Sequence, residues 1–292
     1  MEAPESGSEQ EPMTRIDEYG FERLAGKEAD ELVSDYQAVL NRRAIKWRKL
    51  LQGSRLQRSL RVKRYIRKGI PNEYRSLIWM TVSGAQEQME RNPVYYKKML
   101  ETEEDPKLIE SGMNFIAGYL LIVTKDEEKS FWLLDSLIKK IVPGFYSPTM
   151  IGLKTDQEVL AHLVRMKVPA VAELMERHNV MWTLVVSRWF ICLFIDILPV
   201  ETVLRIWDCL FYEGSKITFR VALTLIKYHQ ASILEANNFP AVCEKFKQIT
   251  RGPLVQDCHN FMKRIFTEPG RLPLSTIIRL REISRAQIDD QS

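Results

Sequence analysis

The stretch that decides the fold is Met181-Trp-Thr-Leu-Val-Val-Ser-Arg-Trp-Phe-Ile-Cys-Leu-Phe-Ile-Asp-Ile-Leu-Pro-Val-Glu-Thr-Val-Leu-Arg-Ile-Trp-Asp-Cys-Leu-Phe-Tyr212. Its first half, Met181–Ile197, is apolar almost all round, which is typical of a helix buried inside a protein. Pro199 ends that helix. Val200–Tyr212 predicts another helix, and Gly214 is placed as its C-terminal stop.

The apolar run Val180–Leu198 is long enough to suggest a membrane span, but Arg188 and Asp196 interrupt it. Each of these charges would cost roughly 2.5–3.5 kcal/mol at the centre of a bilayer helix. A helix buried in protein therefore explains the run better.

The rest of the chain also has helical periodicity. Asn114–Thr124 is apolar almost all round, so a core several helices thick is expected. We find neither an alternating strand pattern nor an internal repeat, which makes the predicted fold class all-α. Thr124 with Glu127, and Thr155 with Glu158, have the spacing of capping boxes and predict two helix starts.

Composition and punctuation divide the chain into four parts. Residues 1–14 are predicted to be a disordered acidic tail, and residues 15–66 a helical basic leader. Gly69 and Pro71 mark the start of the main domain, expected over residues 67–270. Residues 271–292 form a C-terminal helix and tail in this interpretation.

Charge is distributed unevenly along the chain. Twelve Lys or Arg lie between Arg42 and Lys68, and no Asp or Glu occurs from Tyr36 to Asn72. A solvated helix face explains such a block most simply, while an acidic membrane surface or an acidic partner would also fit. No nucleic-acid reader motif accompanies the block, so nucleic acid is not an expected partner.

Common catalytic and metal-binding signatures are absent from the sequence. There is no phosphate-binding GxxxxGK[ST], no GxSxG and no HExxH. The four Cys are far apart without a CxxC, which indicates reduced thiols and no zinc site. The N-terminus lacks the apolar region of a signal peptide, so a cytoplasmic protein is expected.

Six ordered blocks resemble the TBC domain of Rab GTPase activators over about residues 60–270. They are Arg67-Lys-Gly-Ile-Pro-Asn-Glu-Tyr-Arg-Ser-Leu-Ile-Trp79, Gly112-Met-Asn-Phe-Ile-Ala-Gly-Tyr-Leu120, Ser130-Phe-Trp-Leu-Leu134, Gly152-Leu-Lys-Thr-Asp156, Ser187-Arg-Trp-Phe-Ile-Cys192 and Leu198-Pro-Val-Glu-Thr-Val-Leu-Arg-Ile-Trp-Asp208. Six blocks in the same order are too many for a chance match. The resemblance implies a multi-helix TBC-type fold.

Most residues in these blocks are expected to belong to the scaffold. Arg75, Arg188 and Asp208 are predicted to form buried or half-buried ion pairs, with Arg75 also considered as a partner contact. The other structural motif residues are Gly69, Pro71, Trp79, Trp132, Trp189, Pro199 and Trp207, of which the tryptophans are predicted core residues.

The resemblance implies a regulatory activator of GTP hydrolysis, with no active site of its own, acting in vesicle trafficking. Its partner is a Rab-type small GTPase, which carries the GTP and magnesium, so this chain needs no cofactor or metal. In the family, an arginine from I-x-x-D-x-x-R neutralises charge on the phosphoryl group, and a glutamine from Y-x-Q orients the water. A peripheral position on endomembranes is a further expectation.

This sequence departs from the family at both fingers. No Asp has Arg three residues later, and Ser111 stands where the glutamine belongs, directly before Gly112-Met113-Asn114. Tyr228-His-Gln230 matches Y-x-Q but is out of the family's order. No catalytic residue is therefore assigned, while Gly112, Met113 and Asn114 are predicted partner contacts.

The junction at residues 110–112 has the form of an internal deletion, as alternative splicing would produce. The N-terminal half of the domain would then be incomplete, and apolar surface on Asn114–Thr124 and Phe131–Ile138 would be exposed. Impaired Rab activation, a non-catalytic Rab-binding module and an incompletely folded variant all remain open at this point, with a membrane adaptor as a more distant alternative.

Overall fold

The computed structural model describes residues 14–24, 26–53, 56–101 and 112–290, and its elements are almost all helices. The predicted tail over residues 1–14 and the predicted junction residues Glu110 and Ser111 lie outside this part, apart from Thr14. The elements are β1 (Thr14–Ile16), β2 (Glu22–Leu24), α1 (Lys27–Gly53), α2 (Leu60–Lys68), α3 (Asn72–Ser83), α4 (Ala85–Arg91), α5 (Tyr95–Leu100), α7 (Met113–Thr124), α8 (Glu127–Ser136), the π-helical η1 (Leu137–Ile141), α9 (Ile151–Lys167), α10 (Pro169–Arg177), α11 (Trp182–Ile191), α12 (Val200–Glu213), α13 (Lys216–Tyr228), α14 (Gln230–Leu234), α15 (Phe239–Gln248), α16 (Pro253–Gln256), α17 (Cys258–Thr267) and α18 (Leu274–Asp289).

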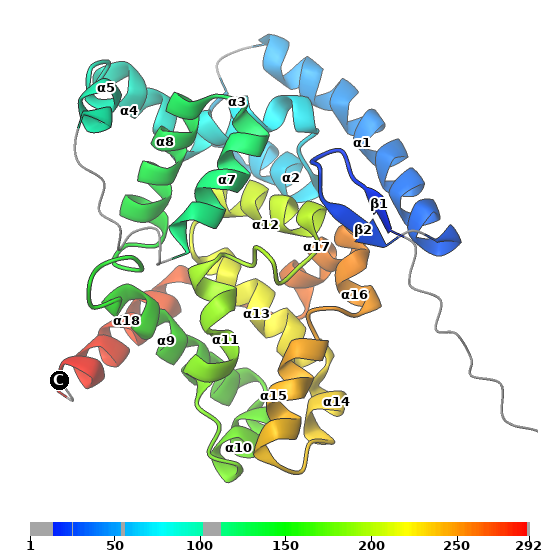
Figure 1. The fold of residues 1–292 in the computed structure, drawn as a ribbon, viewed down its shortest axis with the longest axis vertical. Helices are drawn as coiled ribbons and strands as arrows, with labels where there is room; N and C mark the ends of the chain where they lie inside the picture. The colour runs from blue at the N-terminus through cyan, green and yellow to red at the C-terminus, as the bar shows by residue number, and fades with distance from the viewer. Residues whose placement is uncertain (1–13, 25, 54–55, 102–111, 291–292) are drawn as a thin grey trace, which may run out of the picture.

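The all-α class is confirmed, and α12 lies at the centre of the molecule (Figure 1). Helices α3, α7 and α8 lie on one side of it, α9, α11 and α13 on the other, and α1 covers an outer edge. Every residue of α12 from Thr202 to Tyr212 is buried. A helix without a polar face needs neighbours all round, which is why α2, α3, α13 and α17 all pack on it.

The chain before α1 differs from the predicted helical leader, because residues 14–24 form an antiparallel hairpin. The carboxylate of Asp17 accepts hydrogen bonds from the backbone N–H of Tyr19 and Phe21, both at 2.9 Å. Gly20 takes a positive φ of 89° in the same turn. An Asp that caps its own turn and a Gly that permits the reversal compete successfully with helix formation.

The first half of the opening stretch forms a shorter and less buried helix than predicted. Helix α11 ends at Ile191, and Leu193, Phe194 and Asp196 adopt positive φ in the turn that follows. The indole of Trp207 donates to the Leu193 carbonyl at 3.1 Å, which satisfies one backbone acceptor of this turn. Met181 and Leu184 are 69% and 55% exposed, so the prediction of burial all round was wrong.

Helix α7 is also buried on one face only. Ile116 and Leu120 are fully buried, whereas Phe115 and Leu121 are 51% and 43% exposed. The expected apolar surface is therefore present on this helix. The predicted exposure of residues 131–138 is not found, because Phe131 packs against the rings of Tyr95 and Tyr96 and Leu133 is fully buried.

The two predicted capping boxes were wrong. Helix α8 begins one residue after Asp126, whose carboxylate accepts from the Lys129 N–H at 3.0 Å. Asp is a better N-cap than the Thr two positions earlier, because its carboxylate reaches the exposed N–H groups and carries negative charge. Thr155 lies inside α9, where its hydroxyl donates to the Ile151 carbonyl.

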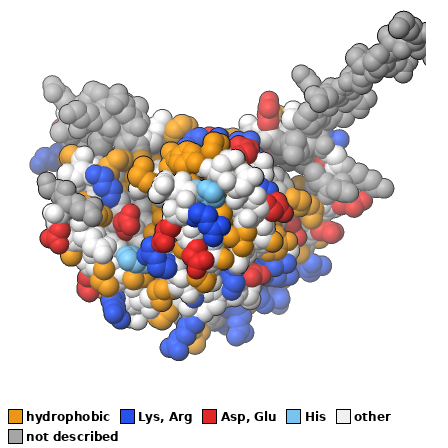
Figure 2. Space-filling view, turned by 90° about the horizontal axis from the view of Figure 1, so that it is seen from below, with side chains coloured by type: hydrophobic (Ala, Val, Ile, Leu, Met, Phe, Trp, Pro, Cys, Tyr) orange, Lys and Arg blue, Asp and Glu red, His pale blue; other side chains and the backbone are white. Residues whose placement is uncertain are grey.

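On the face of the molecule seen from below, acidic and basic side chains are mixed among apolar ones (Figure 2). Within the described ranges, every helix is too short or too polar to cross a membrane.

Core packing in the second half of the domain yields a stability prediction. Phe219 is fully buried on α13, with its ring centroid 5.7 Å from that of Phe190. Phe219→Ala should lower the free energy of unfolding by about 3–5 kcal/mol, since it leaves a cavity. Phe239→Ala, at a side chain 43% exposed, should lower it by less than about 1 kcal/mol. Guanidinium unfolding followed by circular dichroism measures both, and equal losses would contradict the assigned burial.

Candidate functional site

Arg75 lies at the centre of a buried ionic network that joins α3 to α12. Its side chain is 1% exposed, and its guanidinium donates to Glu201 Oε1 at 2.6 Å and to Asp208 Oδ1 at 3.3 Å. Two carboxylates therefore share one buried guanidinium. Removing a charge from water is costly unless it is paired and hydrogen-bonded, and here both conditions are met.

The remaining lone pairs of Asp208 are also satisfied. The indole of Trp79 donates to Oδ1 at 2.9 Å, while Arg205 and the Ile70 N–H each donate to Oδ2 at 3.3 Å. Burial nevertheless raises the pKa of Asp208, because desolvation outweighs the attraction of Arg75 and Arg205. This carboxylate holds helices in place and does not face any open surface.

Glu201 connects the network to the N-terminal hairpin and α1. Tyr36 donates to its Oε1 at 2.8 Å and Tyr19 to its Oε2 at 3.0 Å. Burial acts to raise the pKa of Glu201, but the charge of Arg75 and the hydrogen bonds from Arg75, Tyr36 and Tyr19 together lower it. The hairpin is thus attached to the core through a carboxylate that stays ionised.

The structure removes Arg75 from the candidate partner contacts. A side chain that is 1% exposed and already donates to two carboxylates cannot meet another protein on the surface. Gly69 and Pro71 lie in the adjoining α2–α3 connection, where the Gly69 carbonyl accepts from the Trp47 indole at 2.9 Å. All of these positions serve the packing of α1, α2, α3 and α12.

The tryptophans of the motif blocks all lie in the core. Trp79, Trp132, Trp189 and Trp207 are each 3% exposed or less. Among the described side chains, the indole nitrogen of Trp132 is buried without a hydrogen-bond partner. Pro199 directly precedes α12 and is partly exposed.

Gly112, Met113 and Asn114 open α7 beside the connection between α11 and α12. Gly112 has a φ of 86°, and a Cβ placed on it would lie 3.5 Å from the Cys192 sulfur. Met113 is half-buried and Asn114 is exposed. The start of α7 therefore presents Asn114 and Phe115 to the surface, next to the turn that begins at Cys192.

Arg188 was expected in a buried or half-buried ion pair, and that expectation was wrong. It pairs with Asp196 at 2.8 Å, but the two side chains are 64% and 70% exposed. Both charges act on the Cys192 thiol, whose pKa burial raises, which places them near the start of α7. We call Met113, Asn114, Phe115, Arg188 and Asp196 the α7 surface.

Sequence reasoning missed the exposure of Arg188 because the helix around it is mostly apolar. Val186, Trp189 and Phe190 are buried, while Arg188 points out of the same helix. Exposed Leu184, four residues earlier, lies on the same helical face, and it carried no signal that distinguished it from a core leucine.

Within the described ranges, no group of three or more His, Cys, Asp or Glu side chains could hold a metal ion. The four cysteines are unpaired thiols; Cys192, Cys209 and Cys258 are buried and Cys243 is partly exposed. Polar chemistry at the α7 surface thus rests on one guanidinium, one carboxylate and one amide.

Comparison with known proteins places this arrangement among TBC domains. The Rab-GTPase-TBC domain family matches residues 110–234. Among structures, the chain is similar to a Chlamydomonas flagellar RabGAP TBC domain, with a TM-score of 0.70 and 25% identity, covering 86% of this chain and 99% of that one. The Ypt/Rab-GAP domain of Gyp1p shares the fold, with a TM-score of 0.62 at 15% identity, covering 79% and 98%.

Relatives match over nearly the whole chain. Growth hormone-regulated TBC protein 1-A of Danio rerio is 55% identical over 322 positions, covering 94% of this chain and 90% of the relative. Growth hormone-regulated TBC protein 1 of Homo sapiens is 52% identical over 329 positions, covering 96% and 98%. The Rattus norvegicus protein of that name is 54% identical over 288 positions, covering 95% of both chains.

These alignments differ in the number of positions at which this chain has a gap. Since 94% of 292 residues is about 274, about 48 of the 322 positions hold a residue only in the zebrafish relative. For the rat relative, 95% of 292 is about 277, which leaves about 11 of 288.

The two arginines of the motif blocks yield contrasting predictions. Arg75→Met leaves the buried Asp208 and the partly buried Glu201 without their shared cation, and should lower the free energy of unfolding by about 3–5 kcal/mol. Arg188→Met breaks only an exposed pair and should lower it by about 0–1 kcal/mol. Chemical denaturation of both variants measures the difference. A loss for Arg188→Met as large as that for Arg75→Met would refute the assignment of Arg188 to the surface.

Proposed function

Because this chain belongs to the TBC-domain family of Rab GTPase-activating proteins, we propose that it binds a Rab-type small GTPase without supplying the side chains that accelerate GTP hydrolysis. The single observation that carries this proposal is the junction before Gly112, where Ser111 replaces the glutamine and no Asp-x-x-Arg exists anywhere. A serine hydroxyl is too short to orient the attacking water as a side-chain amide does. A missing arginine finger removes typically 10³–10⁵ in rate.

Two comparisons support an internal deletion at this junction. About 48 aligned positions of the zebrafish relative have no counterpart in the 94% of this chain that it matches. The family match also begins at residue 110, next to the junction. In the alignment with the rat relative, this chain lacks a residue at only about 11 of 288 positions. The rat protein therefore has nearly the same length over the matched region, which supports a short form that recurs among the relatives.

The α7 surface supports binding in spite of the lost fingers. Phe115 supplies an exposed aromatic ring, Asn114 an amide, and Arg188 a guanidinium, which together resemble the composition of a protein interface. Exposed ion pairs contribute only about 0–1 kcal/mol, so Arg188 can leave Asp196 at little cost when a partner approaches.

The decisive experiment measures binding and hydrolysis separately over a panel of GTP-loaded Rab proteins. We expect pull-down of at least one Rab, with a hydrolysis rate at least about 10³-fold below that given by the full zebrafish relative. Asn114→Ala with Phe115→Ala should weaken the pull-down. Phe239→Ala, an exposed aromatic truncation on α15, is the control.

A restored chain provides the complementary test. If the unmatched positions of the zebrafish relative lie at this junction, inserting that segment at Ser111 should recover the hydrolysis rate. Stimulation by the unmodified chain to the level of the relative would refute the proposal, and Arg188→Ala would then show whether this guanidinium acts as the finger. Absence of binding to every Rab would refute the binding half.

The alternative of an incompletely folded variant is favoured by the apolar side chains exposed along α5 and α7. Leu100, Phe115 and Leu121 are 62%, 51% and 43% exposed. Loss of covering helices would lower stability at about 25 cal/mol for each Å² of apolar area. Thermal melting followed by circular dichroism separates the readings, since a sharp cooperative transition excludes this one.

We also propose a cytoplasmic protein that contacts endomembranes peripherally, as a place of action for vesicle trafficking. The basic block from Arg42 to Lys68 supports it, because a cluster of cations is attracted to anionic lipid. Flotation with anionic liposomes tests this placement, and the absence of flotation at low salt would end it.

A further inference from the structure

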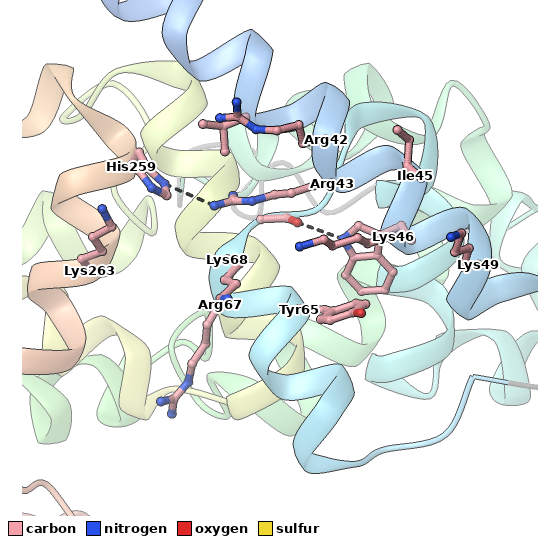
Figure 3. A pocket seen from close by; sticks show the side chains of 13 residues that line it. Arg42, Arg43, Ile45, Lys46, Lys49, Tyr65, Arg67, Lys68, His259 and Lys263 are labelled. Atoms are coloured by element: carbon pink, nitrogen blue, oxygen red, sulfur yellow. Dashed lines mark hydrogen bonds between the residues drawn. The ribbon is translucent and has the colours of Figure 1, made fainter.

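A cavity of about 830 Å³ lies between α1, α2 and α17, away from the α7 surface (Figure 3). Its walls are apolar and aromatic near the floor, where Val39, Trp47 and Tyr65 contribute. Apart from Arg67, six further lining residues are Lys or Arg, and they come from all three helices: Arg42, Arg43, Lys46, Lys49, Lys68 and Lys263. This volume falls in the range that small-molecule sites occupy.

None of the described residues that line the cavity carries a carboxylate. Among the described side chains, none of the six cations forms an ion pair, in contrast to Arg67, which also lines the cavity but donates to Glu213 at 2.6 and 2.7 Å. Six unpaired positive charges facing one concave space repel one another and focus a positive potential into it. A concave surface with this potential attracts anions.

Arg43 provides a second, independent sign of a missing anion. Among the described residues, its buried Nη1 has no hydrogen-bond partner, and its Nη2 lies 3.5 Å from Nδ1 of His259 (Figure 3). Burial lowers the pKa of Arg43 to about 10, with Arg205 adding to the effect, so the guanidinium is still charged at neutral pH. A cation held here without a carboxylate is costly, and negative charge in the cavity would offset that cost.

His259 is neutral in this setting. Burial lowers its pKa to about 4, and the nearby charges of Arg43 and Lys263 act in the same direction. Its ring can therefore accept from Arg43 and adds no acidic group to the wall. An anion in the cavity would offset these cations and raise the pKa of His259 toward its ordinary value.

The floor of the cavity is rigid before any ligand arrives. Trp47 is 1% exposed, and its indole is held by the Gly69 carbonyl at 2.9 Å. The ring of Tyr65 lies against it with centroids 5.6 Å apart. A floor that is already ordered lowers the entropic cost of binding.

We propose that this cavity binds a small ligand carrying several phosphate groups clustered on one ring, either free in solution or as the headgroup of a lipid. Guanidinium and ammonium groups from three directions would contact the phosphates, and the apolar floor would contact the ring. A nucleic-acid strand would need a groove that continues along its backbone, whereas these cations gather around a single open hollow.

The test compares two pairs of neutralising substitutions at exposed lysines. Lys46→Gln with Lys263→Gln removes one charge from each side of the cavity. Lys154→Gln with Lys247→Gln changes net charge equally at exposed positions that do not line it. Calorimetry with inositol hexakisphosphate should show binding by the wild type and the control pair, and at least about tenfold weaker binding by the cavity pair, since charge-assisted contacts are lost.

Vesicles distinguish the two sources of the ligand. Binding to vesicles that contain phosphorylated phosphatidylinositol lipids, with displacement by inositol hexakisphosphate, would identify the lipid headgroup as the ligand. Binding to inositol hexakisphosphate without vesicle binding assigns a free ligand. Equal weakening by both lysine pairs, or vesicle binding that the soluble compound cannot displace, would mean general surface charge and would overturn the proposal, as would no binding at all.

Discussion

A buried guanidinium shared by two carboxylates is the interaction on which the rest of the structure depends. Arg75 on α3 donates to Glu201 and Asp208 on α12, so it joins two helices that are far apart in sequence. Buried charges tolerate almost no displacement, because each lost contact leaves a desolvated ion. Tyr19, Tyr36, Trp79 and Arg205 complete the network, and through them the hairpin, α1 and α2 take their positions around α12.

The network joins elements from both ends of the described chain. All of its members lie on the β1–β2 hairpin, α1, α3, α12 or the turns beside them. The apolar core continues from it through α12 and α13 into the second half of the domain. A change at the start of α7 would therefore act first on surface apolar groups such as Phe115 and Leu121, and only secondarily on the ionic centre.

Charge has opposite roles in the interior and at the surface of this molecule. Arg75 and Arg188 stand in motif blocks of similar appearance, yet one is enclosed by carboxylates and the other points into solvent with a single exposed partner. The cavity between α1, α2 and α17 is a third case, in which unpaired cations line a concave wall. Partner recognition at the α7 surface and anion binding in the cavity use separate helices, so the two proposals can succeed or fail independently.

The sequence by itself determined the helical class and the family, because these depend on residue identity, periodicity and order along the chain. It also indicated a basic block around α1 and α2. The three-dimensional structure alone decided which charges are buried. Whether Arg188 or Arg75 reaches solvent depends on which face of a helix meets a neighbour, and this is not given by the residues beside them in sequence. The hairpin at residues 14–24 and the cavity likewise depend on contacts between distant segments, such as Tyr19 with Glu201 and Arg43 with His259, which local patterns do not encode.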